Sequence, residues 1–270
     1  MWVNGEMQGS LDARDRAVQF GDGCFTTARV LHGKVLCLQA HLQRLQQACE
    51  RLMIAGVDWQ RLAQEMASVA SGDDDGVLKV ILTRGSGGRG YSPSGCQQPA
   101  RIISLAAYPA HYHTLRTRGV RLALSTIRLG KNPLLAGIKH LNRLEQVLIR
   151  TELEQTAADE ALVLDSDGML VECCAANLFW RVGKQVFTPD LTASGVNGIQ
   201  RQQVMQQVIA LGYHLREVRQ EYEVLAHAEE VLITNALMPI LPVSQIDAWC
   251  YSSRDLFSQL SPLKNDVDTP

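Results

Sequence analysis

Lys139 is the residue of this sequence best suited to amine chemistry. It lies within residues 135–145, after apolar neighbours and directly before an expected helix. Burial beside apolar groups lowers the pKa of a lysine towards the neutral amine that a nucleophile needs. The alternative is a lysine at a helix start with its ammonium group in water. The remaining lysines lie in turns, in a strand or in the C-terminal tail: Lys34, Lys79, Lys131, Lys184 and Lys264.

Glu172 is the carboxylate with the most unusual surroundings. It lies between two apolar strand segments and precedes a turn of small residues, Cys173 to Ala176. A buried carboxylate must be paired, for example with a protonated ring nitrogen of a ligand. The alternative is a glutamate on an edge strand that faces solvent.

Two short segments are candidates for holding a phosphate. Residues 197–201 begin an expected helix with Asn197 as the cap, so the first main-chain amides point towards whatever precedes the helix. Residues 234–236 end a buried strand and offer a hydroxyl, an amide and main-chain donors. Arg44 could add positive charge. The alternatives are an ordinary cap, an ordinary turn and a solvated arginine.

The glycine-rich stretch 84–90 carries Arg84 and Arg89 and could contact an anion. It lacks the lysine of a nucleotide-binding P-loop and no helix opens directly after it, so we expect a flexible loop over an active site or a hairpin turn. His111 and His113 have no third ligand evident, and the sequence predicts no metal site.

Composition excludes several classes of protein. The chain of 270 residues is 46% hydrophobic and 20% charged with a net charge of −2, which is typical of a globular protein that does not depend on nucleic acid. No run of about 18 apolar residues predicts a membrane span. The first residues lack the pattern of a secretion signal. Seven cysteines without CxxC spacing favour a reducing cytoplasm.

Hydrophobic periodicity predicts the elements that must position these residues. In the first part of the chain we expect helices over 39–55 and 58–70 and strands over 77–83 and 102–107. After these we expect strands at 120–127, 161–165, 169–172, 177–182, 185–188 and 231–234, with helices at 141–156 and 198–211.

These elements indicate an α/β protein, of the α+β kind, with two domains and mixed or antiparallel sheets. Residues 1–107 form the smaller domain, residues 108–116 an extended linker that contains a proline, and residues 117–270 the larger domain. The strands between 161 and 188 are too close together for helical crossovers and must pair as hairpins. This argues against a doubly wound nucleotide-binding fold.

The ordered motifs resemble the fold-type IV pyridoxal-phosphate enzymes, a group of branched-chain aminotransferases, D-amino-acid aminotransferases and aminodeoxychorismate lyases. The resemblance extends nearly from end to end and rests on residues 15–23, His41 to Arg44, Lys139, Glu172 followed by Asn-Leu-Phe, residues 198–201 and residues 234–236. Within the group, residues 21–29, 84–91 and 137–143 are closer to the lyases than to the transaminases.

The resemblance implies a two-domain architecture with pyridoxal 5'-phosphate between the domains, and a homodimer. Lys139 would hold the cofactor covalently and then act as acid and base. Glu172 would bond the pyridine nitrogen, and Thr27 would assist proton movement. The phosphate would be held by Arg44, the amides of Ile199 and Gln200, and Thr234, Asn235 and Ala236.

The lyases convert 4-amino-4-deoxychorismate into 4-aminobenzoate and pyruvate for folate synthesis, and the resemblance implies this reaction here. Arg89 and Arg29 are candidates for the two carboxylates of the substrate, from charge complementarity. Transaminases of the group usually have threonine where Gln200 and Ala236 stand, and their tyrosine near the cofactor ring oxygen has no evident counterpart. A D- or branched-chain amino-acid aminotransferase and a non-catalytic anion-binding protein remain the alternatives.

Overall fold

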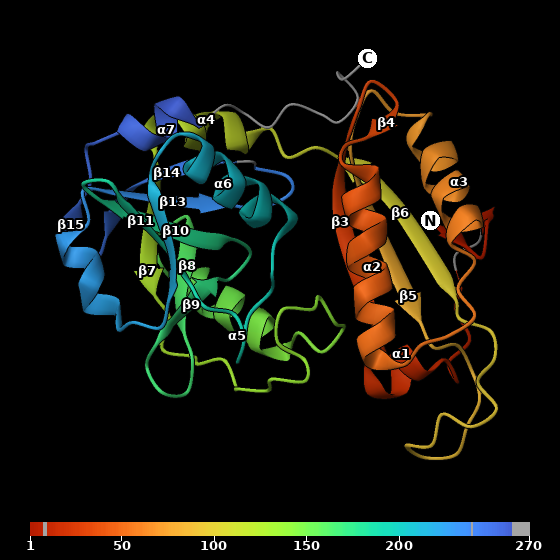
Figure 1. Cartoon of the computed structure of the whole chain (residues 1–270). Helices are drawn as coiled ribbons and strands as arrows, with labels where there is room; N and C mark the ends of the chain where they lie inside the picture. The colour runs from red at the N-terminus through yellow and green to blue at the C-terminus, as the bar shows by residue number, and fades with distance from the viewer. Residues whose placement is uncertain (8–9, 239, 261–270) are drawn as a thin grey trace. The chain divides into compact units, whose positions relative to one another are not determined.

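The computed structural model describes residues 1–7, 10–238 and 240–260, which form two compact units (Figure 1). The first unit comprises Met1–Tyr108 and Ile138–Asn142. The second comprises Pro109–Gly137 and the described residues from Arg143 onwards. Lys264, in the expected tail, lies outside the described residues. Among the residues that are described, no helix is both long enough and apolar enough to cross a membrane.

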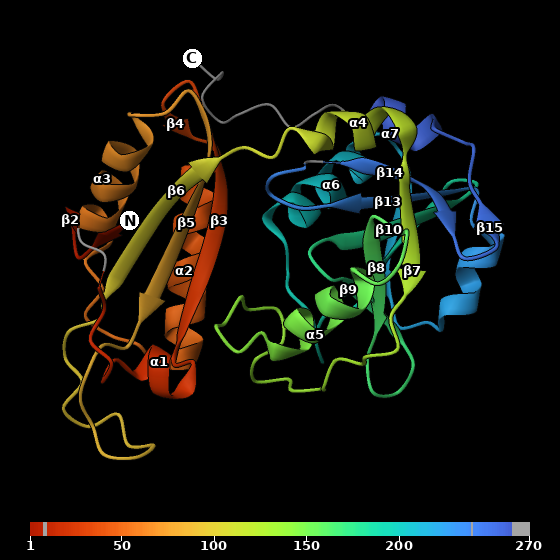
Figure 2. The same ribbon diagram turned by 180° about the vertical axis from the view of Figure 1, so that it is seen from behind.

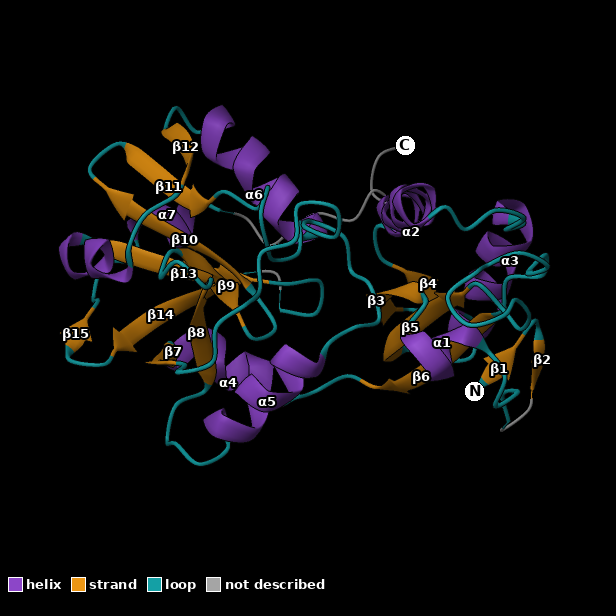
Figure 3. Ribbon diagram, turned by 90° about the horizontal axis from the view of Figure 1, so that it is seen from below, coloured by secondary structure: helices purple, strands orange, loops and turns teal. Residues whose placement is uncertain are grey.

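The first unit contains a six-stranded antiparallel sheet in the order β2-β1-β6-β5-β3-β4. Its strands are β1 (Trp2–Val3), β2 (Glu6–Met7), β3 (Gly23–Leu31), β4 (Lys34–Val35), β5 (Asp75–Thr83) and β6 (Arg101–Ala107). The short helix α1 (Arg16–Phe20) precedes β3. Helices α2 (Leu38–Leu52) and α3 (Trp59–Ala70) cover one face of the sheet, as the view from below shows (Figure 3). Seen from behind, β3, β5 and β6 lie in front of α2 and present the opposite face (Figure 2).

Strand β3 was not among the predicted strands, although it lies between β5 and β4 in this sheet. Its side chains on the helix face are Cys24, Thr26, Ala28 and Val30, and each is fully buried. Small and polar residues occupy most of these positions, so the alternation of large apolar and polar residues that identifies a strand is absent. The strand forms because its partners supply the bulky side chains.

The second unit contains a nine-stranded mixed sheet in the order β12-β11-β10-β13-β14-β7-β8-β9, with β15 beside β14. Its strands are β7 (Val120–Leu124), β8 (Glu160–Leu164), β9 (Leu170–Cys173), β10 (Asn177–Val182), β11 (Gln185–Pro189), β12 (His214–Val218), β13 (Glu230–Thr234), β14 (Leu241–Ile246) and β15 (Trp249–Cys250). The expected hairpins are confirmed, since β8 pairs with β9 and β10 with β11 in antiparallel fashion. Strand β7 is parallel to both of its neighbours.

The helices of this unit are α4 (His111–Arg118), α5 (Leu144–Leu153), α6 (Ile199–Ala210), the 3₁₀ helix η1 (Tyr222–His227) and α7 (Asp255–Gln259). The sheet is buried on both faces along β10: Leu178 and Trp180 belong to one core cluster, while Phe179 packs with Val204 of α6 and Leu232 in another. Burial on both faces explains why the strands β8 and β13 are almost continuously apolar.

Two expectations about segment boundaries were wrong. The extended linker at 108–116 is in large part the helix α4, because only its beginning is held extended by Pro109. Helix α5 begins at Leu144 rather than at 141, because residues 138–142 instead run along β3: the amide of Phe25 donates to the carbonyl of Lys139 over 2.9 Å. Residues 138–142 therefore group with the first unit, whereas the sequence placed them in the domain 117–270.

Candidate functional site

Lys139 lies along the edge of β3, and its side chain is on the face of the strand that the helices do not cover. His140 forms a bridge with Cys24, and the Nζ atom of Lys139 lies 4.7 Å from the ring centroid of Phe25. The lysine is half-buried, and Thr27 lies two residues beyond Phe25 on the same face of the strand. The first unit thus brings together an amine, a hydroxyl and an aromatic ring.

Lys79 joins this group, although the sequence gave it only a structural role as a residue in mid-strand. It is the register partner of Thr27, and its Nζ atom lies 5.1 Å from the centroid of the same Phe25 ring. Two lysines thus contact one aromatic ring in a cation–π arrangement. The pairing of β5 with β3 is what places Lys79 beside Phe25 and Thr27. Because the sequence did not predict β3, it could not indicate this position of Lys79.

Arg44 lies on α2 next to the buried His41. The Nδ1 atom of His41 and the hydroxyl of Thr26 share a hydrogen bond of 2.6 Å. Burial, assisted by the charge of Arg44, lowers the pKa of His41 to about 3, so the imidazole is neutral at pH 7. Burial also lowers the pKa of Arg44 to about 10, and its guanidinium remains charged. Helix α2 therefore supplies a half-buried positive charge, as a phosphate seat requires.

The two arginines proposed for substrate carboxylates differ in their surroundings. Arg29 forms an ion pair of 3.2 Å with Asp75 and lies 4.1 Å from the ring centroid of Tyr108. An incoming carboxylate would have to compete with Asp75 for this guanidinium. Arg89 is exposed, in the glycine-rich loop between β5 and β6.

Arg84, the other arginine of that loop, has a structural role. It donates to both carboxylate oxygens of Asp22, at 2.7 and 3.0 Å, and to the carbonyls of Leu52 and Met53 at the end of α2. Its donors are therefore used inside the first unit. This weakens the idea of a loop that contacts an anion with both of its arginines.

Glu172 is buried in β9 with only 5% of its surface exposed. One carboxylate oxygen, Oε2, accepts a hydrogen bond of 2.9 Å from the amide of Val196. Arg143 acts on it electrostatically: burial lowers the pKa of this arginine, and the charges of Glu172 and Glu145 oppose that shift. The sequence did not indicate Val196, because a main-chain amide leaves no trace in residue type. The alternative of a glutamate that faces solvent is excluded, because the side chain is buried.

The start of α6 differs from the expected capping arrangement. The cap is Gly198 without a side-chain hydrogen bond, and Asn197 instead accepts from Arg201 over 3.1 Å. Asn177 instead fixes the segment before the helix, because its Nδ2 donates to the carbonyl of Val196 over 2.9 Å. A Cβ atom on Gly198 would lie 2.1 Å from Oδ1 of Asn177, so only glycine permits this contact.

Arg201 is part of the scaffold of this helix. It is buried and donates to Glu217 over 2.7 Å and to the carbonyl of Pro189 over 2.9 Å. These bonds hold the first turn of α6 against the sheet. The amides of Ile199 and Gln200 precede the first bond of the helix, which the amide of Gln202 donates to Gly198.

Residues 234–236 lie beside the same segment. Thr234 is buried at the end of β13 and is the register partner of Asn177. The side chain of Asn235 donates to the carbonyl of Ala175 over 2.9 Å and accepts from the amides of Leu237 and Met238. The turn that contains Ala236 is therefore held rigid. The second unit thus joins Glu172, the start of α6 and this turn through Asn177 and Val196.

The chemistry of these groups fits pyridoxal 5'-phosphate. Amides at a helix start suit a phosphate, a buried carboxylate suits a protonated ring nitrogen, and a lysine suits an aldehyde. The glycine at 198 lets the side chain of Asn177 lie close to the main chain where α6 begins. Each class of donor that the cofactor needs is present among the described residues.

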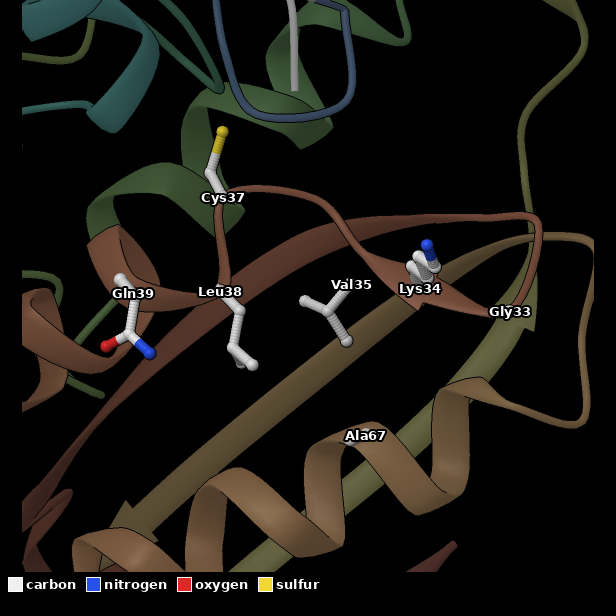
Figure 4. A pocket seen from close by; sticks show the side chains of 7 residues that line it. All are labelled: Gly33, Lys34, Val35, Cys37, Leu38, Gln39 and Ala67. Carbon is white, nitrogen blue, oxygen red and sulfur yellow. The ribbon is translucent and has the colours of Figure 1, made fainter. Parts of the chain in front are cut away.

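A pocket of about 320 Å³ elsewhere in the first unit contains none of these residues. Figure 4 shows the side chains that line it: Gly33, Lys34, Val35, Cys37, Leu38, Gln39 and Ala67. They come from β4, the start of α2 and α3. The pocket is therefore separate from the group that Lys139 forms with Phe25, Thr27 and Lys79.

A family model described as amino-transferase class IV matches residues 23–246. The chain belongs to the class IV aminotransferases. This family contains the fold-type IV pyridoxal-phosphate enzymes, and the predicted fold class is confirmed. The match begins at β3 and ends at the last residue of β14, so it includes Lys139, Glu172 and residues 234–236.

Two members of the class IV aminotransferases with lyase names are especially similar. The aminodeoxychorismate lyase of Vibrio harveyi is 40% identical over 92% of this chain and 91% of its own length. The crystal structure of 4-amino-4-deoxychorismate lyase from Pseudomonas aeruginosa has a TM-score of 0.90 and 38% identity, covering 96% of this chain and 97% of that one. A hypothetical aminotransferase from Mycobacterium tuberculosis in its PLP-bound form shares the fold at 21% identity, with a TM-score of 0.79, covering 93% and 90% of the two chains.

Proposed function

We propose that the chain is a pyridoxal-phosphate-dependent 4-amino-4-deoxychorismate lyase that forms 4-aminobenzoate and pyruvate for folate synthesis. The observation that carries this proposal is its similarity to two lyases over more than nine-tenths of the chain, at 40% and 38% identity. The motifs around Phe25, Arg89 and Lys139, which distinguish lyases from transaminases, support the same choice.

Each unit contains residues that we assign to cofactor binding. Lys139 would bond the aldehyde carbon, and Glu172 would accept a hydrogen bond from the protonated ring nitrogen. The amides of Ile199 and Gln200 and the turn that follows Thr234 would hold the phosphate, and Arg44 would provide the countercharge. Asn235 and Ala236 would add main-chain contacts from that turn.

When bound, pyridoxal phosphate supplies a conjugated ring that takes up electrons from the reacting carbon. The amine of Lys139 removes the proton from the substrate carbon that bears the amino group. The carbon–oxygen bond between the substrate ring and the enolpyruvyl group then breaks, and the substrate ring becomes aromatic. Lys139 returns a proton to the departing enolpyruvyl group, which becomes pyruvate. Thr27 lies on the same face of β3 and assists this proton movement with its hydroxyl.

The two carboxylates of the substrate require positive charge outside the cofactor site. Arg89 is the better candidate of the two arginines, because its side chain is exposed, whereas Arg29 is engaged by Asp75. Lys79, which lies over the Phe25 ring beside Lys139, is a further cation on the same face.

We further propose a homodimer in a reducing cytoplasm. Helix α5 supports a subunit interface, because Leu144, Val147 and Leu148 form an exposed apolar stripe on it. The cysteines support a reducing compartment, because all seven are free thiols. Even Cys24 and Cys49, whose sulfur atoms lie 3.9 Å apart, form no disulfide.

An aminotransferase is the second candidate, because the family is named for that activity. The two functions are distinguished by supplying the purified protein with 4-amino-4-deoxychorismate and, separately, with D-alanine or leucine together with 2-oxoglutarate. The lyase proposal predicts pyruvate and 4-aminobenzoate in the first reaction and little glutamate in the second. Glutamate formation without 4-aminobenzoate would overturn it.

A protein that is colourless with cofactor and unchanged by borohydride would instead indicate the non-catalytic alternative.

A further inference from the structure

Arg16 is a buried arginine whose donors converge on one exposed loop. Only 4% of its surface is exposed, and its Nε donates to Asp22 over 2.8 Å. Its two terminal nitrogens donate to three successive carbonyls, those of Gly90, Tyr91 and Ser92, at 3.0, 3.1 and 3.2 Å respectively. One guanidinium therefore holds a complete turn of the glycine-rich loop.

The loop needs such an anchor because of its composition. Five glycines between 85 and 95 have positive φ: Gly85, Gly87, Gly88, Gly90 and Gly95. A chain segment so rich in glycine has a large conformational entropy unless other groups fix it. Tyr91 adds an aromatic contact, with its ring centroid 5.5 Å from that of Phe20.

Arg16 is itself held in place from the opposite side. Burial raises the pKa of Asp22, but hydrogen bonds from Arg84 and Arg16 outweigh this and lower it below its ordinary value, so the carboxylate is charged at neutral pH. Arg84 in turn is bonded to the end of α2 through the carbonyls of Leu52 and Met53. The loop is thus connected to α2 through a series of charge-assisted hydrogen bonds.

We infer that Arg16 is a positioning residue that presents Arg89 to a carboxylate of the substrate; the inference rests on the proposed lyase function. Arg89 directly precedes the three anchored carbonyls, and the amide of Ser92 donates to its carbonyl over 3.1 Å. The turn from which the Arg89 side chain extends is therefore fixed by Arg16. Gly88 fits this turn closely, because a Cβ atom there would lie 2.1 Å from the carbonyl oxygen of Ser92.

The test compares Arg16→Lys with the wild-type holoenzyme. Lysine retains the charge beside Asp22, but a single ammonium cannot bond Asp22 and three carbonyls at once. We expect KM for 4-amino-4-deoxychorismate to rise about tenfold, with kcat within about twofold of wild type, because only substrate positioning is lost. Trypsin cleavage after Arg89, followed by mass spectrometry, should accelerate at least severalfold.

Two further variants make the result specific. Gly88→Ala disturbs the turn from the loop side, because its Cβ would lie 2.1 Å from the carbonyl oxygen of Ser92 and 3.2 Å from a terminal nitrogen of Arg16. It should therefore raise KM and the rate of cleavage in the same way. Arg14→Lys is the matched control, because Arg14 is exposed and its ion pair, over 2.9 Å, is with Asp12, which lies outside the loop. It should leave both readouts unchanged.

The outcomes separate this inference from the proposed function. If the wild-type protein makes no pyruvate, the lyase proposal fails and the substrate role of Arg89 fails with it, while cleavage after Arg89 still reports on the anchor. If the wild type is active but KM is unchanged in both Arg16→Lys and Gly88→Ala, the positioning role is wrong. Faster cleavage at many sites across the chain would show a general loss of structure and would also overturn it.

Discussion

The amide of Val196 donates a hydrogen bond of 2.9 Å to the carboxylate of Glu172, inside a region where this glutamate is 5% exposed. A buried carboxylate with a fixed orientation can accept one further bond in a defined direction. Its position at the end of β9, beside the start of α6, makes it the group best suited to the ring nitrogen of the cofactor.

Glu172→Gln should retain part of the cofactor and lose most of the rate. Glutamine fills the same space, but it removes the negative charge that stabilises a protonated ring, so kcat should fall about 100-fold. The measurement is kcat together with the stoichiometry of bound pyridoxal phosphate. Glu154→Gln, on an exposed residue in the same unit, is the control. A rate near that of wild type would mean that the carboxylate of Glu172 is structural.

Thr27→Ala should bind the cofactor normally and slow the reaction. The hydroxyl is proposed to assist proton movement near Lys139, and its loss should lower kcat by up to about 100-fold. Thr27→Ser keeps the hydroxyl and should restore most of the rate. If Thr27→Ala and Thr27→Ser have equal activity, the hydroxyl takes no part in the reaction.

Gly198→Ala should weaken cofactor binding. The φ of −65° at this position suits alanine, so the effect would come only from the clash of its Cβ with Asn177 at 2.1 Å. We expect the Kd for pyridoxal phosphate to rise about tenfold, which corresponds to about 1.4 kcal/mol. Gly72→Ala, where the nearest atom lies 4.0 Å away, should not change the Kd. An unaltered Kd in Gly198→Ala would place the phosphate elsewhere.

His41 should make the fold sensitive to acid. Its pKa is about 3 in the folded protein and 6.5 in the reference state, so between these values the unfolded chain binds a proton that the folded chain does not. The free energy of unfolding should therefore fall on acidification, by on the order of 1.4 kcal/mol per pH unit from this group.

Denaturant titrations of the cofactor-free protein between pH 6 and about pH 4 test this prediction. His41→Asn should flatten the pH dependence of the unfolding free energy relative to wild type. His214→Asn, which changes an exposed histidine, should keep the wild-type slope. Equal slopes in all three proteins would contradict a neutral, buried His41.

The sequence predicted the elements whose apolar residues repeat regularly. The helices α2 and α3, strands β5 and β6, and the hairpins of the second unit are present with ends shifted by a few residues. Strand β3 was missed because Cys24, Thr26 and Ala28 fill its buried positions. Helix α4 was missed because Tyr112 and Leu115 are its only apolar residues among polar and basic ones, and none of its residues is fully buried.

For the site, residue types predicted the ionic and nucleophilic groups but not their partners. Lys139 and Glu172 were identified from their neighbours in sequence. The amide of Val196, the role of Lys79 and the engagement of Arg84 and Arg29 depend on pairing between distant segments. Such pairing is a property of tertiary structure, and local sequence contains no record of it.

On the proposed function, this chain eliminates pyruvate and does not transfer an amino group. A lyase regenerates its cofactor in each cycle, whereas a transaminase stops after one turnover unless a keto acid is supplied. The direct measurement is the amount of pyruvate and 4-aminobenzoate formed from 4-amino-4-deoxychorismate without any keto acid, with Lys139→Ala as the blank. We expect equal amounts of both products over many turnovers per active site, and none from Lys139→Ala. Product formation that stops at one equivalent per site, or that needs a keto acid, would contradict it.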